Sequence, residues 1–385
     1  SKMTTIKAIL LDLDNTLIVN PDRAFAAAFL REFQQALNKS FPEIDATTLF
    51  RDGLQLLSGQ RRGDETNYAR IVRHLIETAK SDRIAEVLTD FYATAYPRLS
   101  SWVETVPGAA ELILKLHKEG YAIVIATNPI YPAAAVRHRM AWGGLPLDES
   151  LYALITNADN MHFSKPSPAY YAEIIGRVGI EPDEALMVGD RLSNDIEPAA
   201  LIGIHTYHSK TNKLEELPRM VEELQDVRKP LNLQPDGVIA QLRGNIGAFY
   251  GFMAHIKPNY WLQRPDADEW SLLQIFCHLA EVEVTEHRAR LERILQQENP
   301  FLVGNEPPGA DIPLCDEDGI RVAARFVEER EKTLALLQSI PAESWNRPAR
   351  HSVFGLTTFI EMAYFTAQHD RLHLNQICQT LGRCS

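Results

Sequence analysis

The chain has 385 residues, of which 45% are hydrophobic and 23% charged, and its formal net charge at pH 7 is −12. This length predicts two or three domains, and the acidic charge argues against general affinity for nucleic acid. No apolar run approaches the ~18 residues of a membrane helix, and the N-terminal residues lack the apolar segment of a signal peptide. Because the four cysteines form no CxxC pair, we expect a reducing compartment and a cytoplasmic protein.

The first informative segment is an apolar run from Ile6 to Leu11 that ends in two carboxylates, Asp12 and Asp14. The run is long enough for one buried parallel strand. Burying an unpaired carboxylate costs several kcal/mol, and open α/β sheets bind ligands beyond the carboxyl ends of their strands. The two acids therefore indicate chemistry: one can be a nucleophile that forms an acyl-phosphate, the other a general acid/base, and magnesium can screen both.

A helical pattern occupies residues of about 20–100. Phe25, Phe29, Phe33 and Leu37 recur every four residues and form one face of an amphipathic helix. After Gly108, helix and strand patterns alternate, which predicts a doubly wound parallel sheet with helices on both faces. The alternating segments are 109–119, 121–127, 168–178, 185–189 and 196–202.

Three more polar motifs follow the Asp12–Asp14 motif along the alternating helix and strand segments. Thr127 and Asn128 end a strand, Lys165 stands in a loop that leads into a helix, and Asp190 and Asp195 follow another strand. In this order and at this spacing, the motifs resemble the four motifs of the haloacid-dehalogenase-like (HAD) hydrolases, over residues of about 5–225. The helical segment before the second motif is similar to that family's cap, which closes over the active site.

The resemblance implies a magnesium-dependent phosphohydrolase. Asp12 is then the nucleophile, and Asp14 is the acid/base that also offers its backbone carbonyl to Mg²⁺. Asp190 completes the magnesium site, with Asp195 either a direct ligand or a hydrogen-bonded partner, because hard oxygen ligands suit this ion. Asp14 and the acidic fourth motif point away from dehalogenation, whereas mutase and phosphonatase activities stay open.

The remaining motif residues would bind the phosphate. By resemblance, Thr127 donates its hydroxyl to the phosphoryl oxygens, the Asn128 backbone assists, and Lys165 supplies a compact positive charge near the nucleophile. Taken singly, Thr127 and Lys165 would be a helix cap and a solvated lysine. In the cap, Arg61 and Arg62 either contact the leaving group of the substrate or belong to a solvated face.

A domain boundary is predicted next. Residues 209–234 combine charges with prolines and read as a short helix and a linker. We therefore expect an HAD-like domain at residues 1–225 and a second domain at residues 235–385. The second domain carries four long helical patterns, typical of a four-helix bundle.

Histidines carry the chemistry of this second domain. His369 and His373 lie one helical turn apart on an apolar stripe, and His278 occupies a similar position between Ile275 and Val282. A lone histidine on such a stripe is usually a core residue. Three buried imidazoles need a shared partner, however, and a divalent metal with open coordination positions supplies it.

The second domain resembles the DinB-like family of metal-binding four-helix bundles. The matching residues are Trp270-Ser271, His278 with Glu281, and the closing segment His369–His373. The resemblance implies that His278, His369 and His373 bind a transition metal, namely Zn, Ni, Mn or Fe. Glu281 is either a partner of this site or a surface acid, and we interpret Cys277 as a small core residue.

The predicted fold is thus an α/β doubly wound parallel sheet with a helical cap, followed by an all-α four-helix bundle. The predicted function is hydrolysis of a small phosphorylated metabolite through an aspartyl-phosphate. Two alternatives remain for the bundle: it is the main enzyme, a metal-dependent transferase that uses a low-molecular-weight thiol, or it is a non-catalytic metal-binding or interaction module. An oligomer is left open, and neither a nucleic-acid nor a membrane partner is expected.

Overall fold

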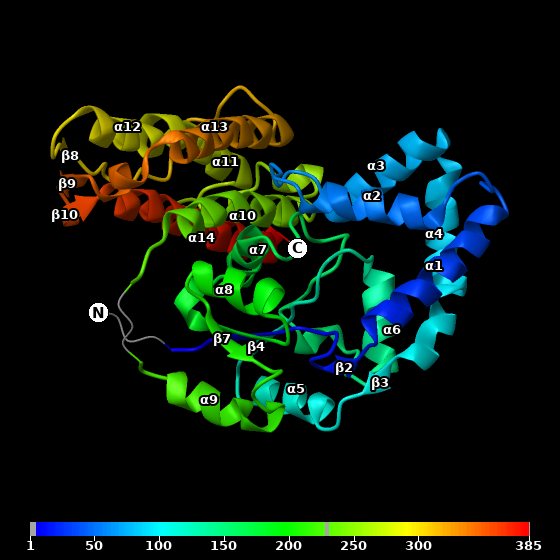
Figure 1. The fold of residues 1–385 in the computed structure, drawn as a ribbon. Coiled ribbons are helices and arrows are strands. Elements are labelled where there is room, and N and C mark those ends of the chain that lie inside the picture. The colour runs from blue at the N-terminus through cyan, green and yellow to red at the C-terminus, as the bar shows by residue number, and fades with distance from the viewer. Residues whose placement is uncertain (1–4, 228–230, 385) are drawn as a thin grey trace.

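The computed structural model describes residues 5–227 and 231–384. An α/β domain carries a helical insertion at one side, and a helical bundle packs over the α/β domain (Figure 1). This architecture confirms the predicted fold class. No helix in the described ranges is both long and apolar enough to cross a bilayer.

A five-stranded sheet with the order β5-β4-β1-β6-β7 forms the centre of the α/β domain, and all its pairs are parallel. Leu11, the last residue of β1, pairs with Ile125 at the end of β4 and with Val188 near the end of β6. The carboxyl ends of these three strands therefore meet at one edge. The strands are β1 (Ala8–Leu11), β4 (Ala122–Ile125), β5 (Leu154–Ile155), β6 (Ala185–Gly189) and β7 (His205–His208).

Side chains alternate between the two faces of this sheet, as they must in a strand. Ile9 and Leu11 belong to a core shared with α5 and α9, whereas Ala8 and Leu10 belong to a core shared with α7 and α8. Helices thus cover both faces. They are α5 (Ala109–Lys118), α6 (Ala133–Trp142), α7 (Pro168–Val178), α8 (Glu197–Leu201) and α9 (Leu217–Leu224).

The insertion is helical, as its periodicity predicts, and aromatic rings fill its core. Phe29 packs edge-on against Phe91 at a centroid distance of 5.3 Å and contacts Phe33 at 6.1 Å. A two-stranded ribbon of β2 (Ile18–Val19) and β3 (Glu104–Thr105) joins the insertion to the α/β domain. The helices are α1 (Asp22–Asn38), α2 (Ala46–Ser58), α3 (Asn67–Ala79) and α4 (Arg83–Thr94), followed by a 3₁₀ turn at Tyr96–Trp102.

The C-terminal bundle has the four predicted helical stretches. The second is one continuous helix in which a π-helical segment, Glu283–Arg288, separates α11 from α12. A small sheet with the order β10-β9-β8 is a feature that the helical patterns do not predict. The elements are α10 (Pro235–Met253), α11 (Leu272–Val282), α12 (Ala289–Gln296), β8 (Phe301–Leu302), α13 (Gly319–Ser339), β9 (Pro348–His351), β10 (Gly355–Thr358) and α14 (Phe359–Cys384).

The predicted linker at 209–234 is partly structured. Its helix α9 buries Leu217 and Val221 in the core of the α/β domain. Residues 228–230, which also fall in the predicted linker, lie outside the described residues. The domain limits of 1–225 and 235–385 stay a prediction.

Glycines of α10 allow the bundle to pack closely against α7 of the α/β domain. A Cβ atom on Gly244 would lie 2.5 Å from the carbonyl oxygen of Ala169, and one on Gly247 would lie 2.7 Å from a carboxylate oxygen of Glu173. Real Cβ atoms do not approach other atoms so closely. On α14, Arg371 forms an ion pair with Glu181 at 2.6 Å, so α7 and the turn after it are held by two bundle helices.

The loop between α2 and α3 attaches the insertion to the bundle. Arg62 forms an ion pair with Glu328 of α13 at 2.8 Å, and Arg243 of α10 donates to the backbone oxygen of Arg61 at 2.9 Å. Arg61 is buried and donates to Ser164 next to Lys165 at 3.2 Å. These arginines thus join three parts of the fold.

The structure gives Cys277 a role that the sequence interpretation did not include. Cys277 is buried, as expected for a core residue, but it forms a disulfide with Cys315 of the loop before α13. The sequence separation of 38 residues gives no local pattern that could predict this pair.

Close packing of α10 on α7 makes a first prediction. Gly244→Ala should lower the free energy of unfolding of the full chain by ~1–3 kcal/mol, because the new methyl group overlaps the α7 backbone. Gly53→Ala is the matched control: a Cβ there meets nothing within 4 Å, and alanine in a helix should raise stability by ~0.5–1 kcal/mol. Urea unfolding checks both, and equal stability of Gly244→Ala and the parent protein would contradict the packing argument.

Candidate functional site

The polar motifs of the sequence meet in one pocket of about 110 Å³ at the carboxyl edge of the sheet. Asp12 and Asp14 follow β1, Thr127 and Asn128 follow β4, and Asp190 follows β6. The adjacent strands β4, β1 and β6 bring these residues together. The full lining is Asp12, Asp14, Asn15, Asp22, Thr127, Asn128, Lys165, Asp190, Arg191, Asn194 and Asp195.

Lys165 lies between two carboxylates in this pocket. Its ammonium group donates to Asp12 Oδ1 at 2.8 Å and to Asp195 Oδ1 at 2.6 Å, and all three side chains are buried. Burial disfavours the charge on Lys165, but the two carboxylates outweigh this effect and hold its pKa well above the ordinary value. The lysine is therefore a permanent cation.

Asp195 reaches Lys165 because of the local backbone. A π-helical turn, Leu192–Ile196, follows β6, and the backbone N–H of Arg191 donates to Asp195 Oδ2 at 3.0 Å. A Cβ on Gly189 would lie 2.4 Å from the Asp195 carboxylate, so only glycine fits at the end of β6.

The side chains that line the pocket carry more negative than positive charge. The pocket is therefore suited to a divalent cation. Asp12, Asp190 and Asp195 offer carboxylate oxygens within 4.8 Å of one another, with Lys165 as the cation among them. Burial, with a smaller contribution from Asp195, raises the pKa of Asp12 to about 7 although Lys165 opposes it. Burial and Asp195 likewise raise the pKa of Asp190. A hard cation bound by these oxygens would relieve the repulsion.

Asp14 is held from two sides. Asn20 donates to its Oδ1 at 2.9 Å, and the buried guanidinium of Arg139 pairs with its Oδ2. Arg139 comes from α6 and lies over the rings of Tyr131 and Phe25, at 5.2 and 5.9 Å from their centroids. Sequence analysis missed this arginine. The sequence feature that could have revealed it is a charged residue on an apolar helix face, beside the buried Val136 and Met140.

The phosphate-binding candidates are also positioned by neighbours. The backbone oxygen of Thr127 accepts hydrogen bonds from Thr156 at 2.7 Å and from Tyr170 at 2.8 Å. Asn128 Oδ1 accepts from the backbone N–H of Lys165 at 3.1 Å, which joins the second motif to the third. The two strand-end loops therefore have fixed positions relative to each other.

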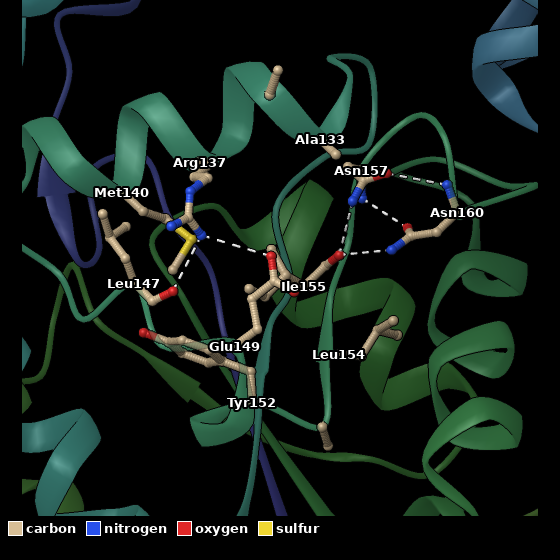
Figure 2. A pocket seen from close by; sticks show the side chains of 12 residues that line it. Ala133, Arg137, Met140, Leu147, Glu149, Tyr152, Leu154, Ile155, Asn157 and Asn160 are labelled. Atoms are coloured by element: carbon tan, nitrogen blue, oxygen red, sulfur yellow. Dashed lines mark hydrogen bonds and ion pairs between the residues drawn. The ribbon is translucent and has the colours of Figure 1, made fainter. Parts of the chain in front are cut away.

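A larger pocket of about 430 Å³ lies elsewhere, beside the edge strand β5 (Figure 2). Its polar side chains bind protein groups: Arg137 donates to Leu147 O at 3.2 Å, and Asn157 and Asn160 donate to Ile155 O at 3.2 and 2.8 Å. None of the motif residues lines it. The smaller, acidic pocket is therefore the candidate active site.

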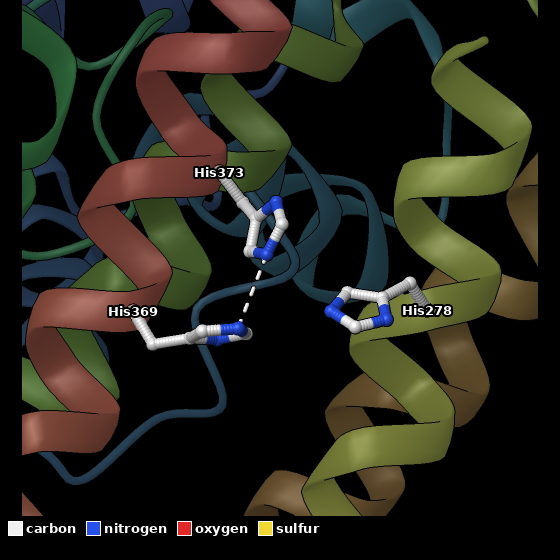
Figure 3. A group of neighbouring side chains, drawn as sticks. All are labelled: His278, His369 and His373. Carbon is white, nitrogen blue, oxygen red and sulfur yellow. Dashed lines mark hydrogen bonds between the residues drawn. The ribbon is translucent and has the colours of Figure 1, made fainter. Parts of the chain in front are cut away.

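In the bundle, His278 of α11 faces His369 and His373 of α14 (Figure 3). Their ligand nitrogens lie within 4.8 Å of one another. His369 Nε2 and His373 Nε2 are 3.2 Å apart, close to the ~3.3 Å edge of a tetrahedron with metal–nitrogen bonds of ~2.0 Å. The triad that the sequence predicts is thus assembled.

The surroundings of the triad fit a divalent metal as well. His373 Nδ1 contacts Gln376 Oε1 at 2.8 Å, so the ring presents its other nitrogen to the triad. Trp270 stacks on the His373 ring at 6.0 Å. Glu281 is exposed and outside the cluster, which favours its interpretation as a surface acid.

A fourth histidine, His287, was missed by sequence analysis. It is buried in the π-helical segment, and its Nε2 lies 3.2 Å from His369 Nδ1. Next to it, the fully buried Arg330 forms ion pairs with Glu283 and Asp370, both at 2.7 Å.

Known protein families match two separate parts of the chain. A family model of haloacid dehalogenase-like hydrolases matches residues 6–203, and a model of the DinB superfamily matches residues 241–377. A glyceraldehyde 3-phosphate phosphatase of Pyrococcus furiosus is 27% identical over 226 residues, 58% of this chain and 89% of that protein. A phosphoglycolate phosphatase of Mesorhizobium japonicum is 31% identical over 204 residues, 51% of this chain and 79% of that protein.

Two solved structures each resemble a part of the chain. A HAD phosphatase from Thermococcus onnurineus covers 58% of this chain and 100% of its own, with 22% identity and a TM-score of 0.38. The four-helix-bundle protein YfiT from Bacillus subtilis covers 40% of this chain and 93% of its own, with 17% identity and a TM-score of 0.33.

The histidine triad makes a prediction about pH. Burial, with a smaller effect of His373, lowers the pKa of His278 to about 4, and burial also lowers the pKa of His373. A neutral imidazole is the form that binds a metal, so protonation of His278 should not compete until the pH falls toward 4, and the lowered pKa of His373 acts in the same direction. Ni²⁺ affinity, measured by chelator competition with excess Mg²⁺ present, should stay within about threefold from pH 7.5 to 5.5.

His373→Ala should weaken Ni²⁺ binding at every pH, and His255→Ala, which removes an exposed imidazole, should not. A tenfold or larger loss of affinity in the parent protein between pH 7.5 and 5.5 would show that the imidazoles titrate like free ones.

Proposed function

The chain belongs to the haloacid dehalogenase-like hydrolases and carries a DinB-superfamily domain, and on this premise we propose that it is a magnesium-dependent phosphohydrolase acting through an aspartyl-phosphate. One observation carries the proposal: the buried carboxylate of Asp12, at the end of β1, shares the ammonium of Lys165 with Asp195 inside an acidic pocket. Phosphoryl transfer needs positive charge beside a carboxylate nucleophile, since the phosphate oxygens otherwise repel it.

Asp12 is the proposed nucleophile. Its carboxylate oxygen attacks phosphorus, the bond from phosphorus to the leaving oxygen breaks, and Asp14 gives that oxygen a proton. Water then attacks the phosphoryl group, Asp14 takes a proton from the water, and Asp12 leaves as a carboxylate. Thr127, the Asn128 backbone and Lys165 bind the phosphoryl oxygens from positions around the same pocket.

Asp12, Asp190, Asp195 and the backbone carbonyl of Asp14 are the proposed magnesium ligands. Burial, with smaller contributions from Asp195 and Asp190, raises the pKa of Asp12 to about 7, and this cost of holding its negative charge supports the assignment. When bound, the ion neutralises charge on the phosphoryl oxygens as it develops.

Arg139 and Asn20 are proposed to position Asp14. They occupy both of its carboxylate oxygens, so the side chain has a defined place beside the nucleophile. An acid/base must exchange a proton with the leaving oxygen, so one of these two contacts has to give way when the substrate binds.

The proposed substrate is a small phosphorylated metabolite. The acidic pocket measures only about 110 Å³, and the exposed pair Arg191–Asp22 lies at its lining, with Asp22 at the start of α1 in the cap. Relatives named for phosphatase activity on glyceraldehyde 3-phosphate and phosphoglycolate support the same size class. Arg61 and Arg62 do not line this pocket, which weakens their proposed contact with the leaving group.

His278, His369 and His373 are the proposed ligands of a transition metal in the bundle. His278 and His369 are only partly buried, which favours an accessible coordination position. The second candidate function, a metal-dependent thiol transferase, would need such an open position. Consumption of a low-molecular-weight thiol by the metal-loaded protein would separate this function from a plain metal-binding module.

The nucleophile can be tested directly. Asp12→Asn should lower kcat/KM for p-nitrophenyl phosphate at least ~1,000-fold, because an amide is a poor nucleophile. EDTA should inhibit the parent protein and Mg²⁺ should restore it. Asp268→Asn, which changes an exposed acid of the bundle, is the control and should keep full activity. Equal activity of Asp12→Asn and the parent would refute the mechanism.

Leaving-group dependence tests the pair Asp14 and Arg139. Asp14→Asn should lose ~100-fold or more on alkyl phosphates, which need protonation, and much less on p-nitrophenyl phosphate. Arg139→Met should show the same preference for good leaving groups, with a loss of ~10-fold on alkyl phosphates. Arg137→Met removes an exposed arginine of the same helix and should change neither. Uniform losses for both substrates would mean that Arg139 has only a structural role.

A further inference from the structure

The π-helical segment between α11 and α12 changes which residues face the triad. An α-helix turns ~100° per residue, so the nine positions from His278 to His287 would place the two side chains on opposite faces. A π-helical turn contains one extra residue, and removing one residue from the count leaves a separation of ~80°. The segment Glu283–Arg288 thereby turns His287 toward α14.

One ring nitrogen of His287 contacts the His369 ring of the triad. Its Nε2 is 3.2 Å from His369 Nδ1, whereas His369 Nε2 is 3.2 Å from His373 Nε2. His369 therefore presents one nitrogen to the triad and the other to His287. His287 is 4% exposed, so protein surrounds this contact.

We propose that His287 is a positioning residue that fixes the tautomer of His369 for metal binding, an inference that rests on the proposed metal site of the bundle. His369 carries its proton on Nδ1 and donates it to His287 Nε2. The lone pair of His369 Nε2 then points to the ligand nitrogens of His278 and His373. His287 in turn carries its own proton on Nδ1, because its Nε2 is the acceptor.

A buried ionic network holds His287 at this place. Glu283, one turn before His287, accepts from Arg330 at 2.7 and 3.0 Å, and Asp370, next to His369, accepts from the same guanidinium at 2.7 and 2.9 Å. Asn245 of α10 donates to Asp370 at 3.0 Å. Arg330 thus joins the π-helical segment to α14, and the two helical segments that carry His287 and His369 cannot separate without breaking buried ion pairs.

The same geometry argues against His287 as a fourth ligand. It lies on the Nδ1 side of His369, and the cluster of nitrogens within 4.8 Å of one another contains His278, His369 and His373. A ligand role is nevertheless an outcome that the experiment can reveal.

The test measures Ni²⁺ affinity of the full chain by competition with a chromophoric chelator, with excess Mg²⁺ present to occupy the carboxylate site. His287→Ala should bind Ni²⁺ ~10–100-fold more weakly. His287→Gln should recover much of this loss, because its amide oxygen can accept from His369 Nδ1. His351→Ala removes another buried imidazole of the bundle and should leave Ni²⁺ affinity unchanged.

A spectroscopic readout separates positioning from ligation and from damage to the fold. Co²⁺-loaded His287→Gln should keep the visible absorption bands of the parent, since the three ligands remain; altered bands would make His287 a ligand and overturn the proposal. Unchanged Ni²⁺ affinity in both His287 variants would also overturn it while leaving the metal site standing. If the parent and His373→Ala bind Ni²⁺ equally, the metal site itself is wrong, and this inference fails with it.

Discussion

The ammonium group of Lys165, shared by Asp12 and Asp195, is the interaction on which the rest of the site depends. It is the cation that permits two carboxylates, one after β1 and one after β6, to be buried near each other. Reaching this arrangement requires the adjacent strand ends of β1 and β6, a glycine at position 189 and a π-helical turn that directs Asp195 back toward the lysine. The surplus of negative charge that remains is the physical reason for proposing magnesium.

The second domain is packed on the first rather than tethered to it. Glycines of α10 lie against the backbone of α7, and Arg62 and Arg243 connect the insertion to the bundle. Arg61 extends these contacts to Ser164, the neighbour of Lys165. Both candidate sites also lie beside π-helical turns, each of which directs one polar side chain, Asp195 or His287, toward its site. In both sites, the extra residue of a π-helical turn changes the direction of one polar side chain.

Sequence reasoning reached the fold class from local periodicity, and it reached the two clusters by adding the resemblance to known families. Strand ends of a parallel sheet share an edge, which brings Asp12 near Asp190, and a spacing of four residues puts His369 and His373 on one face. What it missed depends on non-local or irregular geometry. Arg139 reaches Asp14 from a distant helix, and Cys277 forms a disulfide with a cysteine 38 residues away. Regular α-helical periodicity would place His287 on the wrong face of its helix, because it does not include the extra residue of the π-helical turn.

The most direct measurement is mass spectrometry of the acid-quenched reaction. Asp14→Asn should be mixed with Mg²⁺ and p-nitrophenyl phosphate and quenched within the first turnover, because loss of the acid/base slows hydrolysis of the intermediate. The account predicts one phosphoryl group on the peptide that contains Asp12, formed in step with the released nitrophenol. Release of nitrophenol without a phosphoryl group on that peptide, or with one on a different residue, would contradict it.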